Sequence, residues 1–135
     1  PGKVGKLMRT LSQIHGVELD EERREVAIAD LTPTQARVYA DELEGRQYEL
    51  EHGLAEPLVV IDNGGTLYLA DGHHRAMAAR EAGIETMDAY VIVPRTPVDL
   101  GMAKTAEKEG LRVVGDIEIV DYARHPLVET TKRLQ

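Results

Sequence analysis

Apolar side chains recur at every third or fourth position over residues 4–14, near the start of the chain. This spacing predicts an α-helix with one buried face, which Gly16 would end. The charged run at residues 20–24 predicts a solvated connection, and the alternating pattern at residues 26–30 predicts a strand. Residues 31–34, with Thr and Pro, predict a turn.

The middle of the chain contains the clearest strand and turn signals. Helical spacing of apolar groups over residues 36–50 predicts a helix that ends at residues 52–53, His-Gly. The continuous apolar run at residues 58–61 predicts a strand that is buried on both faces. Asn-Gly-Gly-Thr at residues 63–66 then predicts a hairpin, with residues 67–70 as the returning strand.

A short helix is predicted after that hairpin. Residues 73–82 are rich in Ala, Arg, Glu and Met, and Gly83 follows them as a helix-ending residue. Residues 89–93 predict another buried strand. Thr-Pro-Val-Asp at residues 96–99 is typical of a helix start, so we expect a helix from there to about Glu109, ending at Gly110.

The end of the chain adds a predicted strand at residues 116–120 and a predicted terminal helix at residues 126–134. The order of elements is neither all-helical nor a strict alternation of strand and helix, which favours the α+β class. A length of 135 residues predicts a single domain.

Composition limits the function classes. The chain has 24 acidic and 16 basic residues, a net charge of −8, so its overall field repels nucleic-acid phosphates. It has no Cys, which excludes disulfides, thiolate nucleophiles and Cys-ligated zinc. Its apolar runs are strand-sized and far shorter than a membrane span, and no apolar leader is present. We therefore expect a soluble, cytoplasmic protein without a membrane partner.

The candidate chemistry lies in residues 68–75, where a buried strand meets the start of the predicted helix. A helix N-terminus has unpaired N–H groups and the positive end of the helix dipole, and Gly72 lets a ligand approach the backbone. His73, His74 and Arg75 add cationic groups where the dipole disfavours them. This arrangement predicts an anion site, and it predicts that both imidazoles have a pKa below about 6.5.

Two other interpretations of this stretch stay open. In the first, Asp71 only caps the helix, while His73, His74 and Arg75 are solvated. In the second, Asp62, Asp71 and the two histidines bind a metal ion. Adjacent histidines on a helix point about 100° apart and rarely share one ion. Magnesium that arrives with a nucleotide and is held partly by Asp71 therefore fits better than an all-protein metal site.

The chain resembles the ParB/sulfiredoxin superfamily, also described as ParB-like nuclease domains. The resemblance rests on four stretches, residues 28–35, 52–54, 57–60 and 71–75. In that superfamily a Gly-x-x-Arg loop at a helix start binds nucleotide phosphates. Its Gly, third-position residue and Arg correspond to Gly72, His74 and Arg75.

The resemblance also implies a fold. It covers residues 26–93, which we expect to form a small mixed sheet flanked by helices. Residues 1–16 would add an N-terminal helix, and residues 96–135 a C-terminal extension. These added segments are apolar enough to form a partner surface, so a homodimer is one expectation.

The branches of this superfamily differ at the positions of the two histidines. Sulfiredoxins have a catalytic Cys in place of His73, so sulfiredoxin activity is excluded. ParB proteins have Glu-Arg-Arg after the glycine, of which only Arg75 is kept, and no basic recognition helix follows Val93. Asp-Gly-His-His-Arg is most similar to the free serine kinases of this fold.

That similarity implies a Mg²⁺-dependent phosphotransferase that uses ATP or ADP on a small hydroxyl substrate. Those kinases have acidic residues in the first conserved stretch of the superfamily, whereas this chain has Thr-Gln-Ala there, at residues 34–36. A general base would therefore have to be Asp41, Glu42 or the substrate itself. The implied catalytic residues are Asp71, His73 and His74. The implied nucleotide-binding residues are Gln35, Gly72, His73, His74 and Arg75, with Asp71 on the metal.

The alternative function is a non-catalytic or nuclease module that binds CTP or ATP and acts with DNA. In the binding version, the same loop would change how two protomers pair, and no base is needed. The net charge disfavours DNA binding by this chain, so the alternative requires a local basic patch.

Overall fold

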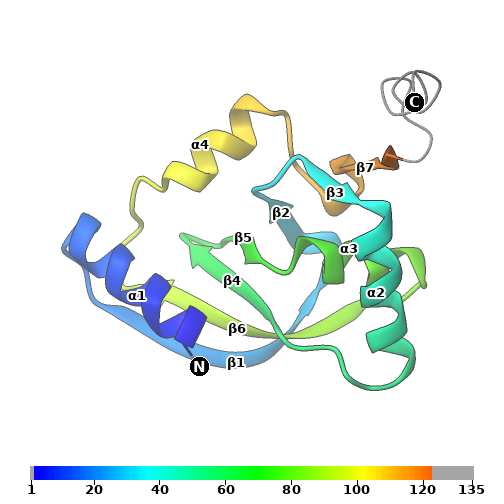
Figure 1. The fold of residues 1–135 in the computed structure, drawn as a ribbon. Helices are drawn as coiled ribbons and strands as arrows, with labels where there is room; N and C mark the ends of the chain where they lie inside the picture. Colours follow the sequence, from blue (N-terminus) through cyan, green and yellow to red (C-terminus); the bar gives the residue numbers. More distant parts are fainter. Residues whose placement is uncertain (1, 123–135) are drawn as a thin grey trace, which may run out of the picture.

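A computed structural model describes residues 2–122 of the protein (Figure 1). The helices are α1 (Gly2–His15), α2 (Ala40–Glu51), α3 (His73–Glu81) and α4 (Gly101–Lys108). The strands are β1 (Leu19–Ala27), β2 (Leu31–Pro33), β3 (Arg37–Tyr39), β4 (Leu58–Asn63), β5 (Thr66–Asp71), β6 (Thr86–Pro94) and β7 (Glu118–Val120). Two 3₁₀ turns, η1 (Ile28–Asp30) and η2 (Val114–Asp116), complete the described elements.

Five of the strands form one mixed sheet in the order β1-β6-β4-β5-β2. The pairs β1–β6 and β4–β5 are antiparallel, whereas β4–β6 and β2–β5 are parallel. Strands β3 and β7 pair separately and in parallel. The predicted α+β class, with a small mixed sheet flanked by helices, is confirmed.

Strand β4 divides the core into two layers, because its alternate residues point to opposite faces of the sheet. Leu58 and Val60 pack in a cluster with residues of α2 and α3. Val59 and Ile61 pack in a second cluster with residues of α1 and α4. Burial on both faces accounts for the continuous apolar run in this strand, and Figure 1 shows the helix pairs on the two sides of the sheet.

The prediction that residues 20–24 form a connection was wrong, because they lie within β1 and pair with β6. Strand β1 is at the sheet edge and most of its side chains are exposed, so it carries charges where a buried strand would carry apolar groups. Arg23 bonds Asp88 on the neighbouring strand, and Arg24 reaches Asp62 at 3.1 Å. The alternating segment at residues 26–30 ends as a strand at Ala27 and continues as η1.

Two further boundaries differ from the prediction. Residues 31–33 form a short strand, β2, rather than a turn, and Pro33 ends it at the edge of the sheet. The helix expected from residue 36 begins at Ala40, because residues 37–39 pair with β7 as β3. Local periodicity did not separate these three strand residues from the helix that follows.

The helix expected from residue 96 begins only at Gly101. The Asn63 side chain donates to the Val98 carbonyl at 2.7 Å and accepts from its N–H at 2.9 Å, which holds this segment in a non-helical conformation. The predicted hairpin is confirmed, with Gly64 and Gly65 both at positive φ. The expected helix at residues 126–134 lies outside the described residues.

α1 and α3 match their predictions closely. α1 ends before Gly16, and α3 begins at His73 and is closed by Ala82 and then Gly83. None of the helices in residues 2–122 is both long and apolar enough to cross a bilayer.

Candidate functional site

The site is built around Gly72, which joins β5 to α3. Gly72 has a backbone φ of +102°, which residues other than glycine rarely adopt. A Cβ at this position would lie 2.7 Å from the Leu58 side chain and 2.8 Å from Nη2 of Arg75. Both the backbone conformation and the close approach of Arg75 therefore require glycine here.

Arg75 folds back over this turn instead of extending into solvent. The residue is only 8% exposed. Its Nη2 donates to Asp71 at 3.1 Å, and its Nη1 donates to Glu56 at 3.4 Å. The two carboxylates thus contact the two terminal nitrogens of Arg75, and a guanidinium has five N–H donors in all.

A small polar hollow of about 150 Å³ opens at this junction. Its walls are Lys3, Gln35, Arg46, Glu56 and residues 70–75. The structure therefore brings together every residue that the sequence nominated for nucleotide binding, including Gln35 from the loop after β2. We call this space the phosphate hollow, after the ligand that the sequence predicts for it.

Three wall residues were missed by sequence reasoning. Lys3 lies in the first turn of α1, Arg46 lies in α2, and Glu56 lies in the loop before β4. Residues 2–6, Gly-Lys-Val-Gly-Lys, combine two glycines with two lysines, and this is the one local signal that could have indicated Lys3. Arg46 pairs with Glu49 at 2.7 Å, and nothing in its local sequence distinguishes it from other surface arginines.

The start of α3 has no side-chain cap in the described structure. The N-cap residue is Gly72, and the first helical hydrogen bond runs from the Ala76 N–H to the Gly72 carbonyl at 2.8 Å. Asp71 points to Arg75, so the alternative in which Asp71 caps the helix is wrong. The backbone N–H groups of residues 73–75 therefore have no acceptor within the helix, because no helical turn precedes them.

His73 is a buried, neutral residue that is 5% exposed. Its Nε2 accepts a hydrogen bond from the Thr34 N–H at 2.9 Å, which places the ring proton on Nδ1. Burial lowers the pKa of His73 to about 4, with a smaller opposing effect from Asp71 and a further lowering effect from His74. The pKa is lowered as expected, but burial rather than the helix dipole is the main cause.

His74 connects α3 to two groups at the start of α2. Its Nε2 lies 3.1 Å from the Tyr39 N–H and 3.1 Å from Oε2 of Glu42. The nitrogen can accept from Tyr39 only when unprotonated, and it can donate to Glu42 only when protonated. The His74 ring also stacks on Tyr39, with centroids 6.1 Å apart. His74 therefore contacts both the end of β3 and the first turn of α2.

The alternative of an all-protein metal site finds no support. Within residues 2–122 there is no group of three or more His, Asp or Glu side chains arranged to hold a metal ion. Asp62 is engaged elsewhere, with Arg24 and with the Gly65 N–H. Asp71 lies beside Arg75 and 3.8 Å from Lys3, so it stays a candidate only for a metal that a nucleotide carries in.

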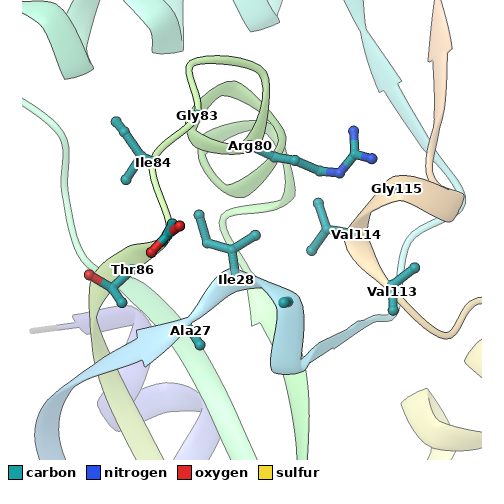
Figure 2. Close-up of a pocket in the computed structure, with 11 residues that line it drawn as sticks. Ala27, Ile28, Arg80, Gly83, Ile84, Thr86, Val113, Val114 and Gly115 are labelled. Carbon is teal, nitrogen blue, oxygen red and sulfur yellow. The ribbon is translucent and has the colours of Figure 1, made fainter.

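A larger hollow of about 720 Å³ lies at the opposite end of α3 (Figure 2). Its walls are mostly aliphatic, and the side chains of Ile28 and Val114 point toward each other across it. Arg80 crosses its rim toward Gly115, and Glu85 is the other ionisable residue in its walls. It contains none of the residues that the sequence nominated.

Comparison with solved structures supports the fold. Protein Atu1540 from Agrobacterium tumefaciens aligns with a TM-score of 0.57 at 20% identity, over 75% of this chain and 64% of that chain. Sulfiredoxin from Arabidopsis thaliana aligns at 0.46, with 21% identity over 52% of this chain and 83% of that chain. ParB from Caulobacter crescentus, in complex with CTP-gamma-S, aligns at 0.45, with 25% identity over 66% and 52%. The alignment with Atu1540 shows that the two chains share a fold.

The sequence itself has a relative of unassigned activity. Uncharacterized protein MJ0188 of Methanocaldococcus jannaschii is 45% identical over 123 residues, which is 90% of this chain and 46% of the relative. The chain therefore spans slightly less than half the length of that protein. No family model matches the sequence.

Proposed function

We propose that this protein binds the phosphate groups of a nucleotide in the phosphate hollow. The observation that carries the proposal is that an uncapped helix N-terminus meets three cationic side chains there, those of Lys3, Arg46 and Arg75. The two acidic wall residues, Glu56 and Asp71, leave an excess of one positive charge. Arg46 is also paired with Glu49, so the walls are close to neutral, whereas the chain as a whole has a net charge of −8.

The size of the hollow limits which part of the ligand it holds. Its volume is about 150 Å³, whereas pockets that enclose a drug-sized ligand occupy roughly 300–1,000 Å³. Phosphate groups fit such a space, and the rest of a nucleotide does not. The nucleoside must then lie outside the phosphate hollow.

The chemistry that we propose is phosphoryl transfer from ATP or ADP to a small hydroxyl substrate. The substrate oxygen attacks the terminal phosphorus, its proton passes to a base, and the shortened nucleotide leaves with its charge held by Arg75 and the helix N-terminus. Glu42, whose Oε2 lies 3.1 Å from Nε2 of His74, supplies that base, because residues 34–36 have no acidic side chain. Magnesium bound to the nucleotide would neutralise phosphate charge, with Asp71 as the protein carboxylate beside it.

Titration calorimetry with ATP, ADP and CTP, each with and without Mg²⁺, tests the binding step. Lys3→Ala and Lys6→Ala are a matched pair, because each removes one exposed positive charge from α1 and only Lys3 lines the hollow. We expect Lys3→Ala to weaken nucleotide binding about threefold to fivefold and Lys6→Ala to leave it unchanged. Equal effects of the two substitutions, or no nucleotide binding by the wild-type chain, would contradict the proposal.

A further inference from the structure

A second hollow adjoins the phosphate hollow and shares one wall with it. It has a volume of about 510 Å³ and is mostly apolar. The shared wall consists of Lys3, Glu56, Asp71 and Arg75. The remaining lining comes from the first turn of α1, the segment before β4 and the sheet, namely Gly2, Val4, Pro57, Val59 and Tyr90. We call this space the side hollow.

The register of the sheet explains how the side hollow is built. Tyr90 on β6 pairs with Val59 on β4, and Val59 pairs with Asp71 on β5. These three residues form a row across neighbouring strands, and Val59 and Tyr90 pack in the cluster on the α1 side of the sheet. The row leads from an aromatic ring, across an aliphatic side chain, to the carboxylate that holds Arg75. The apolar part of the side hollow, formed by Tyr90 and Val59, therefore borders the phosphate hollow at Asp71.

Tyr90 is held in place from the side away from Val59. Its partner on β1 is Arg23, whose Cζ lies 4.7 Å from the centre of the Tyr90 ring. Arg23 also donates to the Tyr90 hydroxyl at 3.1 Å and is itself anchored by Asp88. A ring fixed in this way forms a rigid wall, because the guanidinium satisfies its hydroxyl and supports it by a cation–π contact.

We infer that the side hollow binds the base of the same nucleotide whose phosphates occupy the phosphate hollow. This inference rests on the proposed function. The two spaces share a wall of four residues, so one ligand can have its phosphates in one and its base in the other. The volume of the side hollow lies in the range of small-ligand pockets, and an aromatic ring with aliphatic neighbours suits a flat, apolar-faced base. A small hydroxyl substrate would neither fill it nor use its apolar lining.

The test compares ATP with inorganic tripolyphosphate, which has the same chain of phosphates and no base. Calorimetry of the wild-type chain should show that ATP binds more tightly than tripolyphosphate, by between about 5-fold and 100-fold if the base stacks on an aromatic side chain. Tyr90→Ala should reduce the affinity for ATP to that for tripolyphosphate and leave the tripolyphosphate affinity unchanged. Tyr90→Phe keeps the ring and should keep the preference for ATP.

The outcomes separate this inference from the proposal on which it rests. If tripolyphosphate and ATP both fail to bind, the proposed phosphate site is wrong, and the inference fails with it. If tripolyphosphate binds but ATP binds no more tightly, or Tyr90→Ala leaves the preference intact, the phosphate site stands and the side hollow is not the base site. Tyr90→Leu keeps apolar packing without a ring and replaces Tyr90→Ala if that variant does not fold, as judged by circular dichroism.

Discussion

The imidazole of His73 accepts a hydrogen bond at Nε2 from the backbone N–H of Thr34, at a distance of 2.9 Å. The Thr34 hydroxyl in turn donates to the Leu69 carbonyl on β5 at 2.7 Å. The start of α3, the loop after β2 and the strand before α3 are thus tied together beneath the phosphate hollow. His73 therefore positions the loop that carries Gln35, and this role requires an unprotonated Nε2.

The buried His73 should make stability depend on pH. Its pKa is about 4 in the folded protein and 6.5 ordinarily, so between these values the unfolded chain binds a proton that the folded chain does not. The contribution of His73 to stability is therefore complete above pH 6.5 and is lost as pH falls toward 4. The full loss is on the order of 3 kcal/mol. Urea unfolding at pH 7 and at pH 4.5 measures it.

His73→Gln is the control for this prediction, because an amide oxygen can still accept from Thr34 but does not titrate in this range. The variant should lose less stability than the wild type over the same interval. If the unfolding free energy of the wild type falls no more between pH 7 and pH 4.5 than that of His73→Gln, His73 is not the titrating group.

Replacement of Gly72 tests whether the tight turn determines the position of Arg75. Gly72→Ala adds both the strain of positive φ and contacts of 2.7 and 2.8 Å with Leu58 and Arg75. Gly83→Ala, at the other end of α3, adds strain at φ +76° but meets no atom within 4 Å. We expect each to destabilise the fold by about 1–3 kcal/mol, Gly72→Ala by more, and only Gly72→Ala to weaken nucleotide binding. Thermal unfolding measures the loss of stability, and calorimetry measures the loss of nucleotide affinity. If the two variants lost equal stability and equal affinity, the turn at Gly72 would have no special role in positioning Arg75.

Arg75 should matter for nucleotide binding more than for folding. Arg75→Ala removes charge-assisted hydrogen bonds to phosphate and should weaken binding by about 1.5–3 kcal/mol. The Asp71 side chain that it releases is 43% exposed, so water can solvate the carboxylate and the fold should survive. Arg75→Lys keeps the charge without the planar fork and should recover part of the affinity. Unchanged affinity in the alanine variant would assign binding to the backbone and the other cations.

The core of the site could be predicted from the sequence because its signals are local. A strand, a glycine and a helix start follow one another within residues 66–81, and each has its own sequence pattern. Lys3 and Arg46 could not be found in this way, because α1 and α2 reach the hollow only through tertiary packing. The pairing of His73 with Thr34 is likewise invisible locally, since the two residues are 39 positions apart.

The errors in the fold prediction also have physical causes. Residues 20–24 have the composition of a loop because β1 is an edge strand whose charges remain in solvent and pair across strands, as Arg23 does with Asp88. β2 and β3 are each three residues long, which is too short to show a period. The start of α4 was misplaced because the Asn63 side chain, 35 residues away, engages the backbone of Val98.

The net charge gives a prediction that distinguishes the proposed function from action on DNA. With a charge of −8, the protein should bind duplex DNA weakly and without a steep dependence on salt. Fluorescence anisotropy with a labelled duplex at 50 and 200 mM salt measures both properties. Tight binding that falls by orders of magnitude over this interval would favour a DNA-binding module over a small-molecule enzyme.

The contact between His74 and Glu42 predicts how phosphoryl transfer and nucleotide binding can be separated. Glu42→Gln keeps the size of the side chain and removes the carboxylate that lies 3.1 Å from Nε2 of His74. If Glu42 takes the substrate proton, directly or through His74, the rate of transfer should fall by about 10²- to 10⁴-fold, while nucleotide affinity changes little. Asp41→Asn is the matched control, because Asp41 is the preceding residue in the first turn of α2 and is exposed. The assay follows conversion of ATP or ADP in the presence of a panel of small hydroxyl compounds. A Glu42→Gln variant with wild-type turnover would remove Glu42 as the base and leave that role to Asp41 or the substrate. Loss of nucleotide affinity in the same variant would mean that Glu42 positions the start of α3 rather than accepting a proton.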